Sequence, residues 1–282
     1  MKRIRAIALA TFLAGALAGT ALAAASVGLG TAKTFAVLAG TTITNTGATT
    51  ITGDVGLHPG SALTGFGTVT VHGATHVGDA VALSAKNALI TAYNDAAGAT
   101  PVTAVATELG GTTLTPGVYG SDTLGLTGTL TLDGKGVYIF QAGSTLITAP
   151  NSTVALINGA SACDVYWQIG SSATLDTTTR FKGTIMALTS IALKTGATLQ
   201  GRALARNGAV TLENNVINSS ACAAPSATAG AGPSQPATDT LSSTPAGISE
   251  RASATFVLLL VIAVFALAIS LRFPAFRPRN RD

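Results

Sequence analysis

The segment Ser172–Leu212, SATLDTTTRFKGTIMALTSIALKTGATLQGRALARNGAVTL, consists of short units that resemble one another. Four of them begin at Ser172, Gly183, Gly196 and Gly208, so the steps between them are 11, 13 and 12 residues. Apolar and small polar side chains alternate within the units, which is the period of a β-strand with one buried side. The pattern therefore predicts short strands joined by tight glycine corners, with steps of uneven length.

Units of the same kind recur toward the N-terminus, at GTVTV, GTLTL, GSTLI and STVAL, which begin at Gly67, Gly128, Gly143 and Ser152. Their alternation points aliphatic side chains inward, namely Val69, Val71, Leu130, Leu132, Val154, Leu156, Val210 and Leu212. It points threonines outward, namely Thr68, Thr70, Thr129, Thr131 and Thr211. A sandwich of two sheets gives the same alternation, but the repeated small residues and glycine corners favour stacked turns. We therefore expect a mainly β fold, an irregular right-handed β-helix.

The segment Asp79–Gly98, DAVALSAKNALITAYNDAAG, has the period of an α-helix instead. Asp79 is a suitable N-cap, and Gly98 is a suitable residue to end the helix. A helix of roughly 28 Å matches the height of about six stacked strands, so we expect it to pack along the coil. The predicted buried stripe is Val81, Ala85, Ala88, Leu89, Ala92, Tyr93 and Ala96.

Both ends of the chain have the composition of targeting segments. Residues 1–25 carry Lys2, Arg3 and Arg5, then an apolar run, then an alanine-rich cleavage region, which together predict a signal peptide. A retained membrane helix is the alternative, which the short, glycine-interrupted run disfavours. Residues 223–250 are rich in Pro, Ser, Thr, Ala and Gly and have no apolar period, which is typical of a flexible stalk.

Residues 251–282 predict a transmembrane helix with a basic cytoplasmic tail. The run Ala254–Leu271 contains no charge and is long enough, at roughly 27 Å, to cross most of a bilayer core. The tail after it is rich in arginine, which favours a cytoplasmic C-terminus. We therefore expect the domain of residues 26–222 to be exported and held at the outer face of the membrane.

The positive charge of the chain does not belong to this domain. Between Ser26 and Pro225 there are eight basic and nine acidic side chains, which leaves a net charge of −1. Binding to a phosphate backbone needs a clustered positive surface, so we expect no nucleic-acid partner. The two cysteines, Cys163 and Cys222, both fall in the exported part, where an oxidising exterior favours a disulfide; two unpaired buried cysteines are the alternative.

Six segments taken in order resemble the microbial ice-binding protein family. They are FAVLAGTTITNTGATTITGDVGLHPG from Phe35, AYNDAAG from Ala92, LTPGVY from Leu114, VYIFQAGSTLITA from Val137, VYWQIGSSATL from Val165 and GRALARNGAVTLENN from Gly201. The resemblance spans nearly all of residues 26–217 and implies an irregular β-solenoid with a long flanking helix. It also implies adsorption to ice through a broad, flat solenoid face, by a monomer that needs no cofactor.

Threonine suits such a face because its χ1 is restricted and it carries both a methyl and a hydroxyl. Some bacterial members of the family carry a Thr-Ala/Gly-x-Thr/Asn motif on the ice-binding face, and three matches occur here. The resemblance therefore implies a candidate binding set, to which Thr174 on a regular strand is added: Thr46, Thr49, Thr148, Asn151, Thr174, Thr195 and Thr198. Positions i and i+3 face opposite ways in a straight strand, so each motif needs a corner or bulge. The alternative is that the motifs form corners and that outward strand threonines line the face.

Other functions have less support in the sequence. An enzyme on a β-helix would need paired carboxylates or a metal site, whereas the acidic residues here are scattered singly. We expect His58, His72 and His76 to be turn or surface residues and not metal ligands, and Tyr166 and Trp167 to pack in the core. A cell-surface adhesin or envelope-structural domain that holds another ligand, such as a polysaccharide, is the remaining alternative, because a fold does not determine its ligand.

Overall fold

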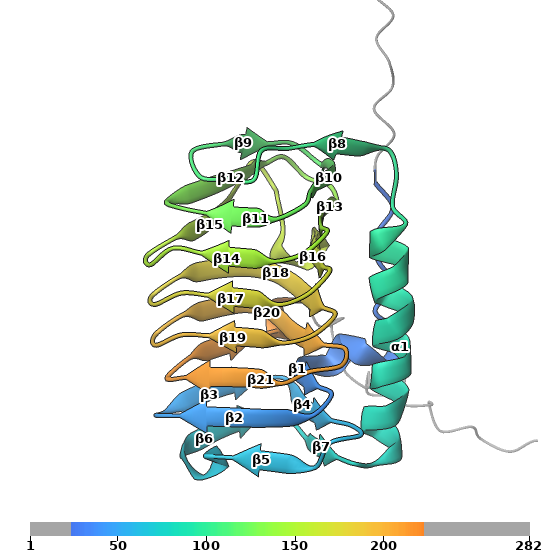
Figure 1. Ribbon diagram of the computed structural model, residues 1–282, viewed down its shortest axis with the longest axis vertical. Helices are drawn as coiled ribbons and strands as arrows, with labels where there is room; N and C mark the ends of the chain where they lie inside the picture. The colour runs from blue at the N-terminus through green and yellow to red at the C-terminus, as the bar shows by residue number, and fades with distance from the viewer. Residues whose placement is uncertain (1–23, 223–282) are drawn as a thin grey trace, which may run out of the picture. The chain divides into compact units, whose positions relative to one another are not determined.

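A computed structural model describes residues 24–222, which form a β-solenoid of parallel strands with one long helix beside it (Figure 1). The mainly β coil expected from the sequence is thus confirmed. The predicted stalk and transmembrane helix lie outside the described residues, as does the predicted signal peptide up to residue 23. Within residues 24–222, no helix combines the length and the apolar character needed to cross a bilayer.

The strands lie on three faces of the coil. We call the first the front face; it is a separate sheet of seven parallel strands, which run along the near side of Figure 1. In spatial order these are β11 (Leu124–Leu126), β14 (Leu146–Thr148), β17 (Ala173–Leu175), β19 (Ile191–Leu193), β21 (Val210–Glu213), β2 (Thr42–Thr46) and β5 (Ala62–Thr64).

The other two faces share one large sheet, because two long strands bend from one face to the other. The helix face contains β8 (Val102–Ala104), β10 (Gly117–Ser121), β13 (Tyr138–Ala142), β16 (Val165–Ile169), the second halves of β18 (Arg180–Ala187) and β20 (Thr198–Ala205), β1 (Phe35–Ala39), β4 (Asp54–Leu57) and β7 (Thr75–Val77). The groove face contains β9 (Thr113–Leu114), β12 (Thr129–Asp133), β15 (Thr153–Ile157), the first halves of β18 and β20, β22 (Val216–Asn218), β3 (Thr49–Thr52) and β6 (Val69–His72).

Glycine makes these bends possible. Gly183 in β18 and Gly201 in β20 have φ angles of 108° and 149°, which L-residues with a side chain rarely adopt. A Cβ atom at Gly201 would lie 1.9 Å from the carbonyl oxygen of Gly183 on the neighbouring turn. The corners of successive turns therefore stack backbone on backbone.

The pairing register shows how many residues one turn of the coil uses. Arg180 pairs with Thr198, and Thr198 pairs with Val216, so successive turns are 18 residues apart here. The 11- to 13-residue steps in the sequence are therefore steps between faces and not turns. Of the four units in Ser172–Leu212, the first and last lie on the front face, the second on the helix face and the third on the groove face.

The chain does not run through the coil in one direction. Strands β1 to β7 build one end, α1 (Ala80–Ala97) then leads the chain alongside the stack, and β8 starts the opposite end (Figure 1). The later turns run back until β20, β21 and β22 pair with β1, β2 and β3. The last turn of the chain thus docks on the first, which places residues far apart in sequence on one continuous face.

The helix begins and ends where the sequence predicts. The Asp79 carboxylate accepts a hydrogen bond from the Ala82 amide at 2.8 Å, and Gly98 is the C-cap. The buried stripe differs from the prediction: Ala82 is buried although it was left out, whereas Val81 is 49% exposed and Ala88 is half-buried. Lys86 is buried in their place, because its stem lies against the coil and its ammonium finds backbone acceptors there.

The core has two parts. Inside the coil, stacked aliphatic side chains surround an aromatic ladder in which Phe140 lies 5.5 Å from Tyr119 and 4.0 Å from Trp167, measured between ring centroids. All the predicted inward residues lie in this core or pack against it. Between coil and helix, a second cluster includes Tyr166, so neither Trp167 nor Tyr166 is free to stack on a ligand.

Two interactions fix the C-terminal end of the described chain to the coil. The predicted disulfide between Cys163 and Cys222 is confirmed, and it closes a sequence separation of 59 residues. Arg202 is buried, and its guanidinium donates to the carbonyl oxygens of Lys33, at 2.7 and 2.9 Å, and of Cys222, at 3.3 Å. Three short 3-10 helices, η1 (Gly30–Thr34), η3 (Ala162–Asp164) and η4 (Ser220–Cys222), lie at these ties, and η2 (Phe66–Thr68) precedes β6.

Candidate functional site

The front face presents two rows of small, uncharged side chains. Each strand except β5 places one outward residue between two inward residues, and in β5 the outward Thr64 follows the inward Leu63. The register aligns these outward residues across all seven strands. The middle row is Gly125, Ile147, Thr174, Ala192, Thr211, Thr44 and Thr64. The second row consists of the residues two positions before the middle-row residues. They are Thr123, Thr145, Ser172, Ser190, Ala209, Thr42 and Ala62.

The rows form a two-dimensional lattice. Neighbouring members of one row are about 4.8 Å apart, and the two rows are about 6.6 Å apart, as the geometry of parallel strands dictates. Neither row contains a charged residue, and most members are Thr, Ser or Ala. The face therefore repeats methyl and hydroxyl groups at fixed positions on a rigid support.

Charge lies at two edges of this face: Glu108 pairs with Gly125 at the end of the middle row, and further charges lie along the border with the groove face. Lys194 and Glu213 lie on neighbouring turns, and their Nζ and Oε1 atoms are 3.4 Å apart. The Thr195 hydroxyl donates to the other Glu213 oxygen at 3.1 Å, and Thr46 pairs with Glu213 on the next strand. A network of paired charges thus marks the corner between the front face and the groove face.

The seven candidate residues, six threonines and Asn151, do not form one surface. Thr174 lies in the middle row of the front face, and Thr46 is exposed at the border end of β2. Thr195 is exposed in the corner itself, and Asn151 is an exposed corner residue with a φ of 61°. Thr198 belongs to the groove face.

Thr49 and Thr148 are each only 1% exposed, so neither side chain reaches a surface ligand in this conformation. The Thr49 hydroxyl donates to Asn45 Oδ1 at 2.6 Å and accepts from the Asn215 amide. Thr148 bonds to the Thr179 hydroxyl at 2.8 Å and accepts from the Asp176 amide. Their assignment as contact residues is therefore corrected: in these two motifs the i and i+3 positions straddle a corner, and one of them turns inward to hold it, whereas neither Thr195 nor Thr198 of the third motif is buried.

Sequence reasoning missed most of the lattice, although Thr174 and Thr211 were recognised as outward. The hydroxyl residues that it left out are Thr42, Thr44, Thr64, Thr123, Thr145, Ser172 and Ser190. The sequence does contain a local signal for the middle row. Most middle-row residues lie between two inward residues in a three-residue strand core such as ITN, ATL, IAL or VTL. The second row has no such signal, because it falls just outside most strands.

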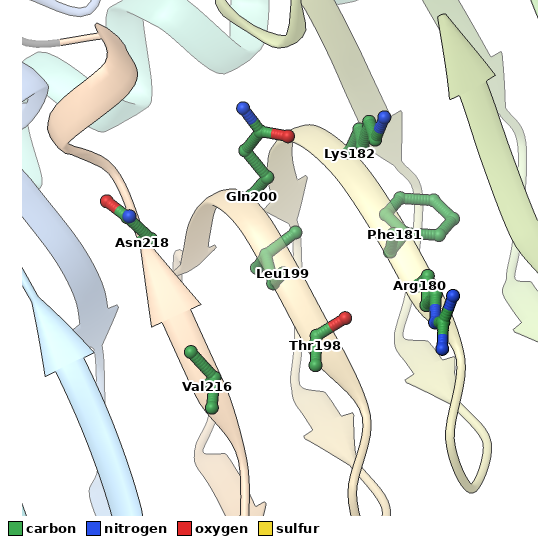
Figure 2. A pocket seen from close by; sticks show the side chains of 8 residues that line it. All are labelled: Arg180, Phe181, Lys182, Thr198, Leu199, Gln200, Val216 and Asn218. Carbon is green, nitrogen blue, oxygen red and sulfur yellow. The ribbon is translucent and has the colours of Figure 1, made fainter.

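The other two faces differ in kind. The helix face is covered by α1, and its outward residues Val118, Ile139, Tyr166, Met186 and Leu204 are buried under the helix. The groove face carries Arg180 and Lys182 and has a depression of about 330 Å³ beside them (Figure 2). Only the front face is therefore both uncovered and free of charge in its central rows.

Two titratable groups with shifted pKa values are Lys86, buried between α1 and the coil, and Glu108, which pairs with Gly125 at the end of the middle row. Burial, and secondarily the nearby Arg206 charge, lowers the pKa of Lys86 to about 8. Partial burial tends to raise the pKa of Glu108, but hydrogen bonds from Thr127 and Gly110 outweigh it and lower the pKa. Within residues 24–222, no three His, Cys, Asp or Glu side chains are grouped so as to hold a metal ion, and His76 pairs with Asp79 at 2.8 Å.

The sequence of this domain matches a known family. Residues 37–218 match the model described as ice-binding-like. The chain belongs to this ice-binding-like family. It is 50% identical over 201 residues to an ice-binding protein of Nostoc sp. strain HG1, a match that covers 69% of this chain and 74% of that one. It is 34% identical to an ice-binding protein of Flavobacterium frigoris strain PS1, over 68% and 75% of the two chains.

Solved structures of ice-binding proteins have the same architecture as this family member. The crystal structure of an ice-binding protein from an Antarctic biological consortium superposes with a TM-score of 0.69 at 45% identity, over 76% of this chain and 96% of that one. One from the Antarctic ascomycete Antarctomyces psychrotrophicus gives a TM-score of 0.66 at 39% identity, over 69% and 98%. The ice-binding-like domain is therefore a complete folded unit in these relatives.

Proposed function

We propose that this protein binds ice and that the front face is the surface that adsorbs. The observation that carries the proposal is the uncharged middle row, Gly125, Ile147, Thr174, Ala192, Thr211, Thr44 and Thr64, which is in register across seven strands. Membership of the family and the ice-binding proteins among its relatives support the same function.

The physical basis is order in two directions. Hydroxyls and methyls repeated at about 4.8 Å and about 6.6 Å hold water in fixed positions beside the face. The methyl groups favour leaving liquid water, and a rigid coil loses little conformational entropy when it docks. Adsorption therefore needs no catalytic group, and we infer that the protein acts without enzymatic chemistry and as a monomer.

The test is one bulky substitution in the middle row. Thr174→Tyr in the full chain projects a ring from the centre of the lattice and should reduce thermal hysteresis and recrystallisation inhibition by about tenfold, because the ring prevents close packing of the flat face against ice. Thr131→Tyr on the groove face is the matched control, since Thr131 is an outward, half-buried threonine of a regular strand. Equal activity of Thr174→Tyr and the control would reject the front face, and an inactive parent protein would reject ice binding.

We further propose that the domain works outside the cell, held there by the predicted signal peptide, stalk and transmembrane helix. The disulfide between Cys163 and Cys222 supports an oxidising location, because disulfides are rare in the cytosol. Protease added to intact cells should release the domain if it is displayed on a stalk. Protection of the domain until the cells are lysed would contradict display.

A further inference from the structure

The groove face carries a depression of about 330 Å³ that the ice-binding proposal does not use (Figure 2). Three neighbouring strands, β18, β20 and β22, supply its walls. Their outward residues form a grid of two rows: Arg180, Thr198 and Val216 in one, and Lys182, Gln200 and Asn218 in the other. Phe181 and Leu199 turn into the core beneath it.

The two cations of this groove have no counter-charge. Neither Arg180 nor Lys182 makes a side-chain hydrogen bond or ion pair within residues 24–222. Lys194, on the border of the front face, by contrast pairs with Glu213. The grid continues into Thr153 on one side and into Thr50 and Thr52 on the other, and none of these three residues carries a charge.

Hydrogen-bond donors extend from the cations across the groove. Lys182, Gln200 and Asn218 stand in one row on strands about 4.8 Å apart, and each side chain carries a donor. The Asn218 carbonyl oxygen accepts from Ser220, which leaves its amide nitrogen free to donate outward. Val216 is 50% exposed beside this row and offers methyl groups to an apolar surface.

We propose that this groove is a binding site for an acidic polysaccharide, a chain of carboxylated sugars. The carboxylates would pair with Arg180 and Lys182, since a guanidinium binds a carboxylate through two parallel hydrogen bonds. Sugar hydroxyls would accept from the Gln200 and Asn218 amides, and Val216 would contact the C–H face of a ring. An open groove across three strands suits an extended polymer better than a small molecule, which closed pockets bury.

The site is separate from the front face. Groove and lattice lie on different faces of the coil, so one molecule can hold ice and a carboxylated polymer together. The groove would then link the ice surface to an extracellular acidic matrix. This inference does not depend on ice binding and has its own test.

The test measures retention of the full chain on polygalacturonate beads, with dextran beads as the neutral comparison. We expect binding to polygalacturonate that weakens as salt is added, because exposed charges are screened. Arg180→Gln/Lys182→Gln should weaken binding by about tenfold. The matched control is Lys33→Gln/Lys135→Gln, which removes the same charge from two exposed lysines outside the groove.

Each outcome supports or overturns the proposal. Selective loss in the Arg180→Gln/Lys182→Gln variant, with unchanged circular dichroism and thermal hysteresis, supports the groove. Equal losses in both double variants would show that only net charge matters, and absence of binding by the parent protein would overturn the site. Monomeric galacturonate that competes as well as the polymer would overturn the polysaccharide assignment. Binding to phosphatidylglycerol vesicles but not to polygalacturonate would replace it with a membrane surface.

Discussion

The front face and the groove face are built from the same coil and the same short parallel strands, yet they present opposite surfaces. The front face has uncharged outward rows, and Lys194 and Glu213 pair with each other at its border. The groove face places Arg180 and Lys182 beside a depression and leaves them unpaired within residues 24–222. The contrast shows that a solenoid fixes the spacing of side chains, whereas the identity of the outward residues decides what the surface can bind.

The largest expected effect on ice binding comes from introducing a charge into the uncharged middle row of the front face. Thr211→Lys places a charge at the centre of the front face, where burial against ice would require its desolvation. We expect thermal hysteresis to fall by about tenfold or more. Thr129→Lys, on an exposed groove-face threonine, should leave it unchanged, and similar losses in both variants would remove the distinction between the faces.

Removing the disulfide between Cys163 and Cys222 should destabilise the whole coil, and therefore both faces. Cys163→Ser/Cys222→Ser opens a loop of 59 residues and should lower the free energy of unfolding by about 4 kcal/mol in the chain-entropy model. Denaturant unfolding of the full chain under oxidising conditions measures the loss. A change below about 1 kcal/mol would mean that Arg202 and the β20–β1 pairing hold the ends without the disulfide.

The corner between the two faces offers a smaller and more selective test. Thr148→Val removes a buried hydroxyl that bonds to Thr179 and accepts from the Asp176 amide, at a cost of about 1–3 kcal/mol for the unsatisfied groups. Thr195→Val, at an exposed corner position, is the comparison and should change the free energy of unfolding by less than about 0.5 kcal/mol. If Thr195→Val instead lost more stability than Thr148→Val, the assignment of the buried hydroxyl as the corner support would be wrong.

The features of this molecule that could be predicted from its sequence are those that depend on local patterns. The alternation of Leu130, Leu132, Val210 and Leu212 with threonines identified the inward side, and Asp79 marked the start of the helix. These features depend on residues a few positions apart. The length of the helix, compared with the height of the stacked strands, predicted that it packs along the coil, and the family resemblance implied the same combination.

The placement of strands on faces could not be read in this way, because it depends on contacts between distant residues. Thr211 and Thr44 are neighbours only because β21 docks on β2 after the chain has passed through every other turn. The burial of Thr49 depends likewise on Asn215, which lies 166 residues away. A four-residue motif at a corner does not show which of its ends turns inward, and Thr49 and Thr148 were assigned to the wrong side for that reason.

The smallest predicted effect concerns the helix face, which α1 covers. Measuring it tests whether the front face and the groove face depend on the attachment of α1. The Lys86 ammonium donates to the carbonyl oxygens of Ala205 and Arg206 and so ties α1 to the coil. Its pKa is lowered to about 8 in the folded protein, mainly by burial, from 10.5. Between these values the unfolded chain binds more protons than the folded one, so the free energy of unfolding should rise with pH.

We expect a gain of about 1–2 kcal/mol between pH 8 and pH 10. The expected rise ends at about pH 10 because of Tyr138, whose pKa burial raises from 10.0 to about 12. Above pH 10 the folded chain therefore holds this proton more tightly than the unfolded chain, and the free energy of unfolding falls with pH. Lys86→Met should abolish the gain, whereas Lys135→Met, at an exposed site, should keep it. A gain that persists in Lys86→Met would place the titrating group elsewhere. If the gain is confirmed while thermal hysteresis stays constant with pH, the helix stabilises the coil without shaping the front face.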